Sequence, residues 1–168
     1  MKKVRAGLLF KKRFIAIASL LVVLDIISKQ YALQELLEGI SYNFVPFIDL
    51  YLTFNSGIAF GFLDLGDRFV SNALTLVGVL IATYIFYLIK IEEDNLKQIS
   101  LSIILGGAIG NILDRSMDGL VTDFLHLKIA DFSFFIFNIA DASITVGAIF
   151  LIYLELFKKN HIRDEQAN

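Results

Sequence analysis

Four apolar segments, each long enough to cross a lipid bilayer as a helix, constrain the fold of this chain more than any other feature. They cover residues 14–33, 69–89, 96–113 and 139–157, and a transmembrane helix needs about 20 predominantly apolar residues. Hydrophobic residues make up 57% of the 168 residues and charged residues only 19%, which is too apolar for an ordinary soluble domain. The sequence therefore predicts a single integral-membrane domain, mainly α, with four transmembrane helices.

The basic residues around these segments predict how the chain is oriented. Eleven Lys or Arg residues lie before the first segment, between the second and third, and after the fourth, whereas only Arg68 and Lys128 lie in the opposite loops. The positive-inside rule then places both termini in the cytoplasm. Residues 36–68 and 116–138 are expected to face outward, and residues 158–168 to form a cytoplasmic tail whose last eight residues are disordered.

The first apolar segment, with its basic start, also resembles a cleaved signal peptide. Asp25 and Lys29 interrupt it, and no A-x-A cleavage site follows closely. A signal peptide lacks such interruptions, so an uncleaved helix is the favoured interpretation.

Both outward segments contain alternating runs typical of half-buried strands. Apolar residues alternate with polar ones over residues 48–54, and a similar alternation covers residues 121–129. The only proline, Pro46, lies at the start of the first run, where a strand tolerates it. A small extracytoplasmic β-sheet at the outer membrane surface is predicted.

Several classes of chemistry are excluded. The chain has no cysteine, so disulfides, thiolate catalysis and cysteine-ligated zinc are absent. A net charge of −2 gives no basic footprint for nucleic acid. Neither a G-x-S-x-G elbow nor an H-E-x-x-H zinc motif is present. A Ser28–Lys29 dyad is disfavoured because adjacent helical residues point in different directions, and His126 lies on the strand face opposite Asp123.

Polar residues within the apolar segments allow both structural and functional interpretations. Asp25 and Lys29 are four residues apart, so they either neutralise each other as an ion pair or help to shape a site. Lys29 could alternatively extend toward the interface. Asn55, in the stretch NSGIAFG, either makes a turn, which composition favours, or binds a substrate backbone.

The stretch GGAIGNILDR, residues 106–115, combines close helix packing with polar groups. Gly106 and Gly110 are spaced to let two helices approach closely. Asn111, Asp114 and Arg115 follow at the outward end of the same segment. The two charges pair locally or with a neighbour, or they line a polar pocket.

Asp123 and Asp141 are both expected at the outward membrane boundary. Asp141 lies near the start of the fourth segment, where the helix dipole favours an anion, and Asn138 is a candidate cap before it. Two carboxylates that meet in a low-dielectric site share a proton. One can then act as a base toward water and the other as an acid toward a carbonyl.

Taken together, these motifs resemble the lipoprotein signal peptidase family, also called signal peptidase II, which are intramembrane aspartyl proteases of the bacterial plasma membrane. The resemblance covers roughly residues 14–157 and rests on five motifs in matching order: DIISK, NSGIAFG, GGAIGNILDR, VTDF and FNIAD. It implies a four-helix bundle with a sheet that cradles the substrate, no metal or other cofactor, and inhibition by globomycin.

The resemblance also implies roles for particular residues. Asp123 and Asp141 match the catalytic aspartates, and the supporting positions match Asp25, Lys29, Asn55, Gly107, Asn111, Arg115, Asn138 and Ala140. The implied substrates are diacylated prolipoproteins, cleaved just before the lipidated cysteine by an enzyme that is expected to be a monomer in contact with membrane lipids. Phe135 departs from the family, which often has proline two residues before the Phe-Asn of its last motif.

Two other classes of protein remain as alternatives. A small transporter or channel component also carries intramembrane charges, but these are expected to be spread across the membrane. A structural or assembly protein would have every charge locally paired. The concentration of charges near the outward side favours an enzyme.

Overall fold

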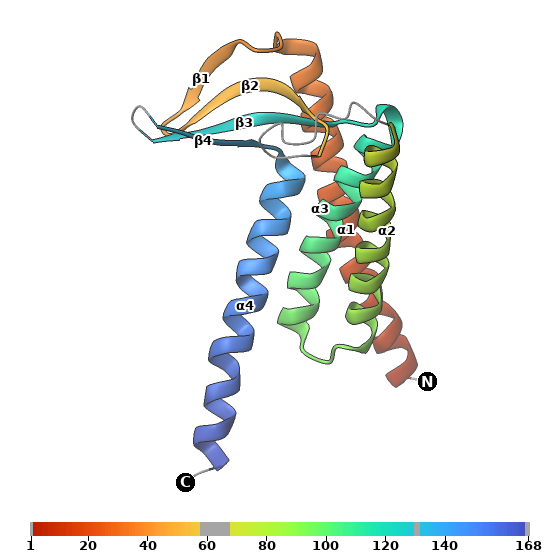
Figure 1. The fold of residues 1–168 in the computed structure, drawn as a ribbon. Coiled ribbons are helices and arrows are strands. Elements are labelled where there is room, and N and C mark those ends of the chain that lie inside the picture. Colours follow the sequence, from red (N-terminus) through yellow and green to blue (C-terminus); the bar gives the residue numbers. More distant parts are fainter. Residues whose placement is uncertain (1, 58–67, 130–131, 167–168) are drawn as a thin grey trace.

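The computed structural model describes residues 2–57, 68–129 and 132–166, with side chains described for residues 13–57, 68–129 and 132–157. Figure 1 shows a helical bundle with a four-stranded sheet across one end and both termini at the other. The elements in chain order are α1 (Lys2–Glu35), β1 (Ser41–Val45), β2 (Ile48–Asn55), α2 (Arg68–Ile91), α3 (Asn95–Asp118), β3 (Val121–Ile129), β4 (Phe132–Phe137) and α4 (Ile139–Gln166). Four apolar helices and a small antiparallel sheet are therefore confirmed.

Each of the four helices contains a stretch that is long and apolar enough to span a membrane: residues 13–35, 68–91, 95–118 and 139–157. Large apolar side chains are exposed along all four helices, including Leu20, Leu80, Leu113 and Ile152. Exposed apolar surface of this extent is typical of a membrane-embedded protein.

The third helix, α3, is the centre of the bundle. It packs against α1, α2 and α4, whereas α4 makes fewer contacts with α1. Glycines permit this close approach, because a Cβ atom on Gly106 would lie 2.9 Å from the backbone oxygen of Ala18 on α1. At Gly110 it would lie 2.6 Å from Oδ2 of Asp25. The prediction that Gly106 and Gly110 bring helices together is confirmed.

The sheet is antiparallel with the strand order β1-β2-β3-β4. The two predicted strands are β2 and β3, but β1 and β4 were not predicted. The sequence of β4, FSFFIF, shows little alternation, and β1 has only five residues. Pro46 lies in the turn between β1 and β2 rather than in a strand, and Phe47 beside it has a positive φ of 73°.

β3, the second predicted strand, was expected to be buried on one face only, and this is true of only part of it. The first four residues of β3, Val121 to Phe124, are all buried, so both faces of the strand are covered there. In β2 the pairing shifts between Leu50 and Thr53, and an irregularity of this kind breaks the alternation of side chains. The sheet is buried where it meets the helices and more exposed at its far end.

The helices extend beyond the predicted segments. Asp94 caps the start of α3, accepting a hydrogen bond from the backbone N of Leu96, and Gly119 ends the helix in the left-handed conformation with a φ of 94°. Asp114 and Arg115 therefore lie inside α3 rather than after it. At the other end of the chain, α4 continues to Gln166 and so extends into the predicted tail.

We expect Gly106→Val to lower the midpoint of thermal unfolding in detergent by several degrees. The added methyl groups would collide with the backbone of α1, and overpacking of this kind costs about 1–3 kcal/mol. Ala16→Val, at an exposed position on α1, is the matched control and should leave the midpoint nearly unchanged. Equal midpoints for the two variants would contradict the packing of α1 on α3.

Candidate active site

Five elements bring polar side chains together where the bundle meets the sheet. Asp25 and Lys29 come from α1, Asn111, Asp114 and Arg115 from α3, and Asn138 and Asp141 from the start of α4. Asn55 ends β2 and Asp123 lies near the start of β3. The polar residues predicted for the site, together with Asp114, thus lie in one region of the structure.

Asp123 lies in β3 and its side chain is held by two asparagine amides. Asn138 donates to its Oδ1 over 2.7 Å, and Asn55 donates to its Oδ2 over 3.0 Å. The residue is only 2% exposed. Both carboxylate oxygens are therefore fixed in direction.

Asp141 lies in the first turn of α4, three residues after Asn138. The Asn138 side chain accepts from the backbone N of Asp141 over 2.9 Å, and the Asp141 side chain accepts from the backbone N of Asn138 over 3.3 Å. This reciprocal pair is a capping box, which satisfies two backbone donors that a helix start leaves free. Asn138 is therefore the cap, and its amide also contacts Asp123, so one side chain joins both aspartates.

Asn111 links Asp141 to a buried lysine. Its amide nitrogen donates to Oδ1 of Asp141 over 2.7 Å, and its oxygen accepts from Nζ of Lys29 over 3.0 Å. The same oxygen accepts from Asn138 over 3.2 Å. Because an ammonium group can only donate, Lys29 fixes the orientation of the Asn111 amide, with its NH₂ directed at Asp141.

Lys29 pairs with two carboxylates and so makes more than the single ion pair considered from the sequence. Its Nζ lies 2.8 Å from Oδ2 of Asp25 and 3.1 Å from Oδ2 of Asp114. Asp25 is completely buried, and its other oxygen accepts from the backbone N of Ala140 over 2.9 Å. Lys29 thus connects α1 to α3, and Asp25 connects α1 to the first turn of α4.

Ala140 and Gly107 contribute by being small. A Cβ on Gly107 would collide with the backbone oxygen of Ala140, and Ala140 is only 1% exposed. Because of this contact, α4 begins directly against α3, which places Asp141 within reach of Asn111.

Asp114 is a member of this network that was not among the predicted site residues. Besides pairing with Lys29, its Oδ2 accepts from the backbone N of Thr122 over 2.8 Å. It therefore ties the end of α3 to the strand that carries Asp123. Its position four residues after Gly110 and next to Arg115 was visible in the sequence, but its partners were not.

Arg115 and Asn55 lie beside each other at the edge of the site. Nη2 of Arg115 is 3.5 Å from the backbone oxygen of Asn55. Asn55 accepts from the backbone N of Gly57 over 2.8 Å, so it makes the predicted turn while its amide group also holds Asp123. Ala59 and Phe60 of the same motif lie outside the described residues.

Burial raises the pKa of Asp123 to about 6. The negative charge of Asp141 acts in the same direction, while the hydrogen bonds from Asn55 and Asn138 and the positive charge of Lys29 act against it. A carboxyl group with such a pKa can hold a proton at a pH where ordinary aspartates have lost theirs.

The other residues discussed from the sequence, Ser28, His126 and Phe135, have contacts of their own. Ser28 donates to the backbone oxygen of Asp25, and His126 lies 2.6 Å from the Ser133 hydroxyl on the neighbouring strand. Phe135 lies in β4, paired with Leu127, and is 56% exposed. Within the described residues, no group of three or more histidines or carboxylates is arranged to hold a metal ion.

A groove of about 280 Å³ lies between α2, α3 and α4 and ends at this network. Its walls are mostly apolar and include Leu74, Gly78, Ile104, Ala108 and Ile144, while Thr75, Asn111 and Arg115 are its polar members. A mostly apolar groove thus lies along the transmembrane helices and reaches Asn111 and Arg115 of this network.

Comparison with known proteins identifies the family. Residues 17–157 match the family model described as signal peptidase (SPase) II. The chain belongs to the signal peptidase II family. Members of this family are aspartic peptidases that act on peptide bonds.

Several relatives are named lipoprotein signal peptidase. The chain is 44% identical to the lipoprotein signal peptidase of Polynucleobacter necessarius, over 87% of this chain and 90% of that protein. It is 38% identical to that of Burkholderia vietnamiensis, covering 85% and 87%, and 36% identical to that of Pelagibacter ubique, covering 86% and 87%. A solved structure of a bacterial membrane enzyme has a TM-score of 0.78 at 28% identity, covering 89% of this chain and 91% of the other.

We expect Lys29→Met to destabilise the protein strongly, because it leaves the completely buried Asp25 without its cation. Breaking a buried ion pair from one side costs about 3–5 kcal/mol. The double variant Asp25→Asn/Lys29→Met should recover part of this loss, since an asparagine oxygen can still accept from Ala140. Denaturant unfolding in detergent measures the free energy of unfolding of the single and the double variant.

Lys90→Met, which removes a lysine from the opposite end of the bundle, serves as the control for the Lys29 variants. It should change the free energy of unfolding only slightly. If the double variant were no more stable than Lys29→Met alone, the Asp25–Lys29 pair would not be the source of the loss.

Proposed function

We propose that this protein removes signal peptides from diacylglyceryl-modified prolipoproteins by hydrolysing the peptide bond just before the lipidated cysteine, with Asp123 and Asp141 activating water. Membership of the signal peptidase II family supports the reaction. The observation that carries the assignment of residues is that Asn138 contacts both aspartates, while each is also held by a further asparagine, Asn55 or Asn111.

The chemistry follows from two carboxyl groups that hold one proton between them. The raised pKa of Asp123 favours this residue as the proton holder, which leaves Asp141 as the base. Asp141 removes a proton from water as the oxygen of that water attacks the scissile carbonyl carbon. Asp123 gives its proton to the carbonyl oxygen, which yields a neutral tetrahedral diol.

Collapse of the diol completes the reaction. Asp123, now ionised, takes a proton back from one hydroxyl group as the carbonyl re-forms. Asp141 transfers its proton to the leaving nitrogen of the cysteine as the C–N bond breaks. Water has then been added across the peptide bond, and both carboxyl groups have returned to their starting states.

The scissile bond of such a substrate and the proposed catalytic site are expected at the same depth relative to the membrane. A signal peptide has an apolar segment and the diacylglyceryl group is a lipid, so both belong in the bilayer. The groove between α2, α3 and α4 offers the signal peptide an apolar surface that ends at Asn111 and Arg115. We expect the sheet and both aspartates to lie at the extracytoplasmic face of the plasma membrane, with both termini in the cytoplasm.

The distribution of charge disfavours a transporter or channel. Within the described spans, Asp25, Lys29, Asp114, Arg115 and Asp141 lie at the end of the bundle that meets the sheet, and the Lys97–Glu155 pair lies at the other end. Between them, residues 98–110 of α3 carry no charge. A path for ions would need polar groups across this depth.

Asp123→Asn and Asp141→Asn should each reduce cleavage of a diacylated prolipoprotein by about 10²–10⁴-fold, because each removes a group that must exchange protons. Purified enzyme in detergent and a mobility shift of the product on a gel measure this, and globomycin should inhibit the wild type. Asp118→Asn, at an exposed carboxylate of α3, is the matched control and should cleave like wild type. A folded dyad variant that cleaved at the wild-type rate would refute the assignment.

The pH dependence of cleavage should report the proton on Asp123. Since this carboxyl group must be protonated to act as the acid, kcat/KM should fall as the pH rises above about 6, the pKa of Asp123. The amide of Asn55 stabilises the ionised form, so Asn55→Ala should raise that pKa and move the fall to higher pH. Asn95→Ala, at the other end of α3, should leave the profile in place, and a shift of the Asn55→Ala profile to lower pH would contradict the interpretation.

A further inference from the structure

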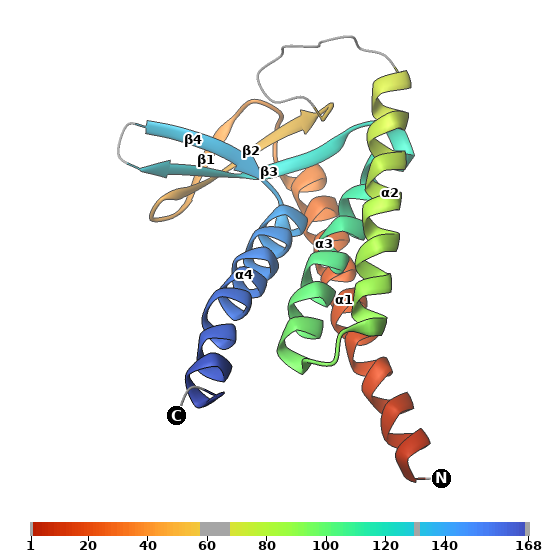
Figure 2. The ribbon, with the colours of Figure 1, turned by 60° about the horizontal axis from the view of Figure 1, so that its bottom comes forward.

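The sheet extends sideways beyond the helices that support it. Its strands cross the end of the bundle and continue past the start of α4 in both views (Figure 1, Figure 2). An element that projects sideways at the end of membrane-spanning helices lies over the lipid beside them. The far end of the sheet is therefore placed to meet the membrane surface.

The strand register makes this part of the sheet amphipathic. Residues paired across antiparallel strands share a face, and the pairs Leu50–Leu125 and Leu127–Phe135 lie on the face of β3 that also carries Asp123. The opposite face carries the paired residues Asn43, Asp49 and His126, together with Lys128. An amphipathic element at a membrane surface buries its apolar face at the boundary of the acyl chains, which leaves the polar face at the level of the headgroups.

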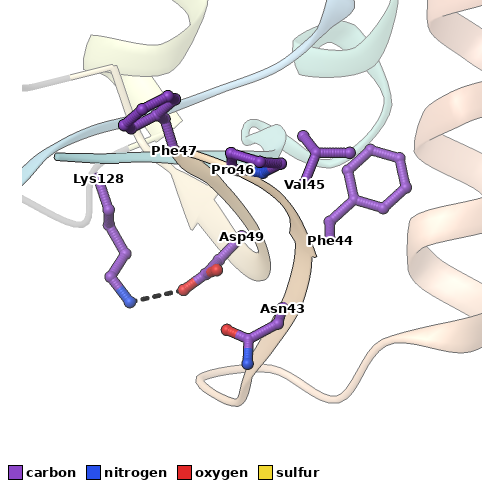
Figure 3. A pocket seen from close by; sticks show the side chains of 7 residues that line it. All are labelled: Asn43, Phe44, Val45, Pro46, Phe47, Asp49 and Lys128. Carbon is purple, nitrogen blue, oxygen red and sulfur yellow. Dashed lines mark hydrogen bonds and ion pairs between the residues drawn. The ribbon is translucent and has the colours of Figure 1, made fainter. Parts of the chain in front are cut away.

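A hollow of about 450 Å³ lies at the tip of the β1–β2 hairpin, on this far end of the sheet. We call it the hairpin-tip pocket, and its lining residues are Asn43, Phe44, Val45, Pro46, Phe47, Asp49 and Lys128. Figure 3 shows the Lys128 and Asp49 side chains meeting, with the Asn43 amide close by and the apolar residues along the turn. Lys128 is five residues from Asp123 along β3, which is about 17 Å in an extended strand, so the pocket is separate from the carboxylate pair.

The charged groups of the pocket are fixed in place and balance each other. Nζ of Lys128 lies 2.6 Å from Oδ2 of Asp49, which also accepts from the Ser41 hydroxyl over 3.0 Å. The Lys128 ammonium, and then the Ser41 hydroxyl, hold the pKa of Asp49 below its usual value, so its carboxylate is charged at neutral pH. An ammonium has three donors and a carboxylate has several acceptor positions, so both groups have capacity for a ligand.

The apolar side of the pocket is exposed and its backbone is strained. Phe44 is 60% exposed and Phe47 is 64% exposed. Phe47 also has a positive φ of 73°, although it is not glycine, and its backbone oxygen accepts from the backbone N of Lys128 over 2.8 Å. A bulky residue rarely adopts this conformation, and such strain is found where a site requires it. Here it fixes the turn, with its phenylalanine, against the strand that carries the lysine.

We propose that the hairpin-tip pocket binds the headgroup of a zwitterionic phospholipid such as phosphatidylethanolamine, with the phosphate on Lys128 and Asn43 and the ammonium on Asp49. Because the pocket offers one cation and one anion, it complements a headgroup that carries one of each. An anionic headgroup without an ammonium would bring a further negative charge beside the Asp49 carboxylate, with no cation to offset it. Phe44 and Phe47 would lie against the glycerol and the first acyl carbons. The site rests on the proposed placement of the sheet at the membrane surface, but not on the reaction.

Native mass spectrometry of the full chain, released from micelles with equal amounts of phosphatidylethanolamine and phosphatidylglycerol, tests this proposal. The wild type should retain phosphatidylethanolamine about fivefold over phosphatidylglycerol, a preference on the scale of one Lys near a membrane surface. Asp49→Asn should reverse the preference, because Lys128 then becomes an uncompensated cation. Lys128→Met should retain less of both lipids, because the phosphate then has no cation.

Two controls make the result decisive. Lys90→Met removes a lysine at the opposite end of the bundle and should keep the wild-type lipid ratio. Cleavage of a diacylated prolipoprotein in detergent by the same samples should be unchanged in Asp49→Asn and Lys128→Met, which shows that they are folded and separates this proposal from the proposed function. Lipid ratios that are the same in the wild type, Asp49→Asn and Lys128→Met would overturn the headgroup site.

Discussion

The buried ammonium of Lys29 is the interaction on which the rest of the site depends. It pairs with Asp25 and Asp114 and donates to Asn111. Burying these charges in a membrane helix would be costly if they were not paired. Once paired, they connect α1, α3 and the start of α4 through groups that have few alternative partners. The bundle and the site are therefore stabilised by the same contacts.

Asparagine side chains connect this ion-pair network to Asp123 and Asp141 and determine which groups the two aspartates contact. An amide has donors on one side and an acceptor on the other, so a partner on one side determines what the other side presents. Lys29 orients Asn111 toward Asp141, and the capping box orients Asn138 toward Asp123. The same capping box also begins α4, so the helix start and the position of Asp141 are established together.

The sheet combines two different environments in one element. Near the helices, β3 is buried on both faces, and this burial raises the pKa of Asp123. Farther out, the strands are more exposed and separate an apolar face from a polar one. The inner part of the sheet carries the proposed proton holder, and the outer part is the one that we propose meets the membrane surface.

The sequence by itself determined the four helices, two of the four strands and most of the polar residues that meet where the bundle joins the sheet, because apolar length, alternation and polar residues in apolar segments are local signals. It did not determine β1 or β4, which are short or lack a clear alternation and are paired with β2 and β3 in the sheet. It left open whether Asp25 and Lys29 only neutralise each other or help to shape a site, and it did not include Asp114 among the site residues. Only the tertiary structure decided that Asp114 completes the pairing of Lys29 and that Asn138 joins both aspartates, because these contacts connect residues that are far apart in the chain.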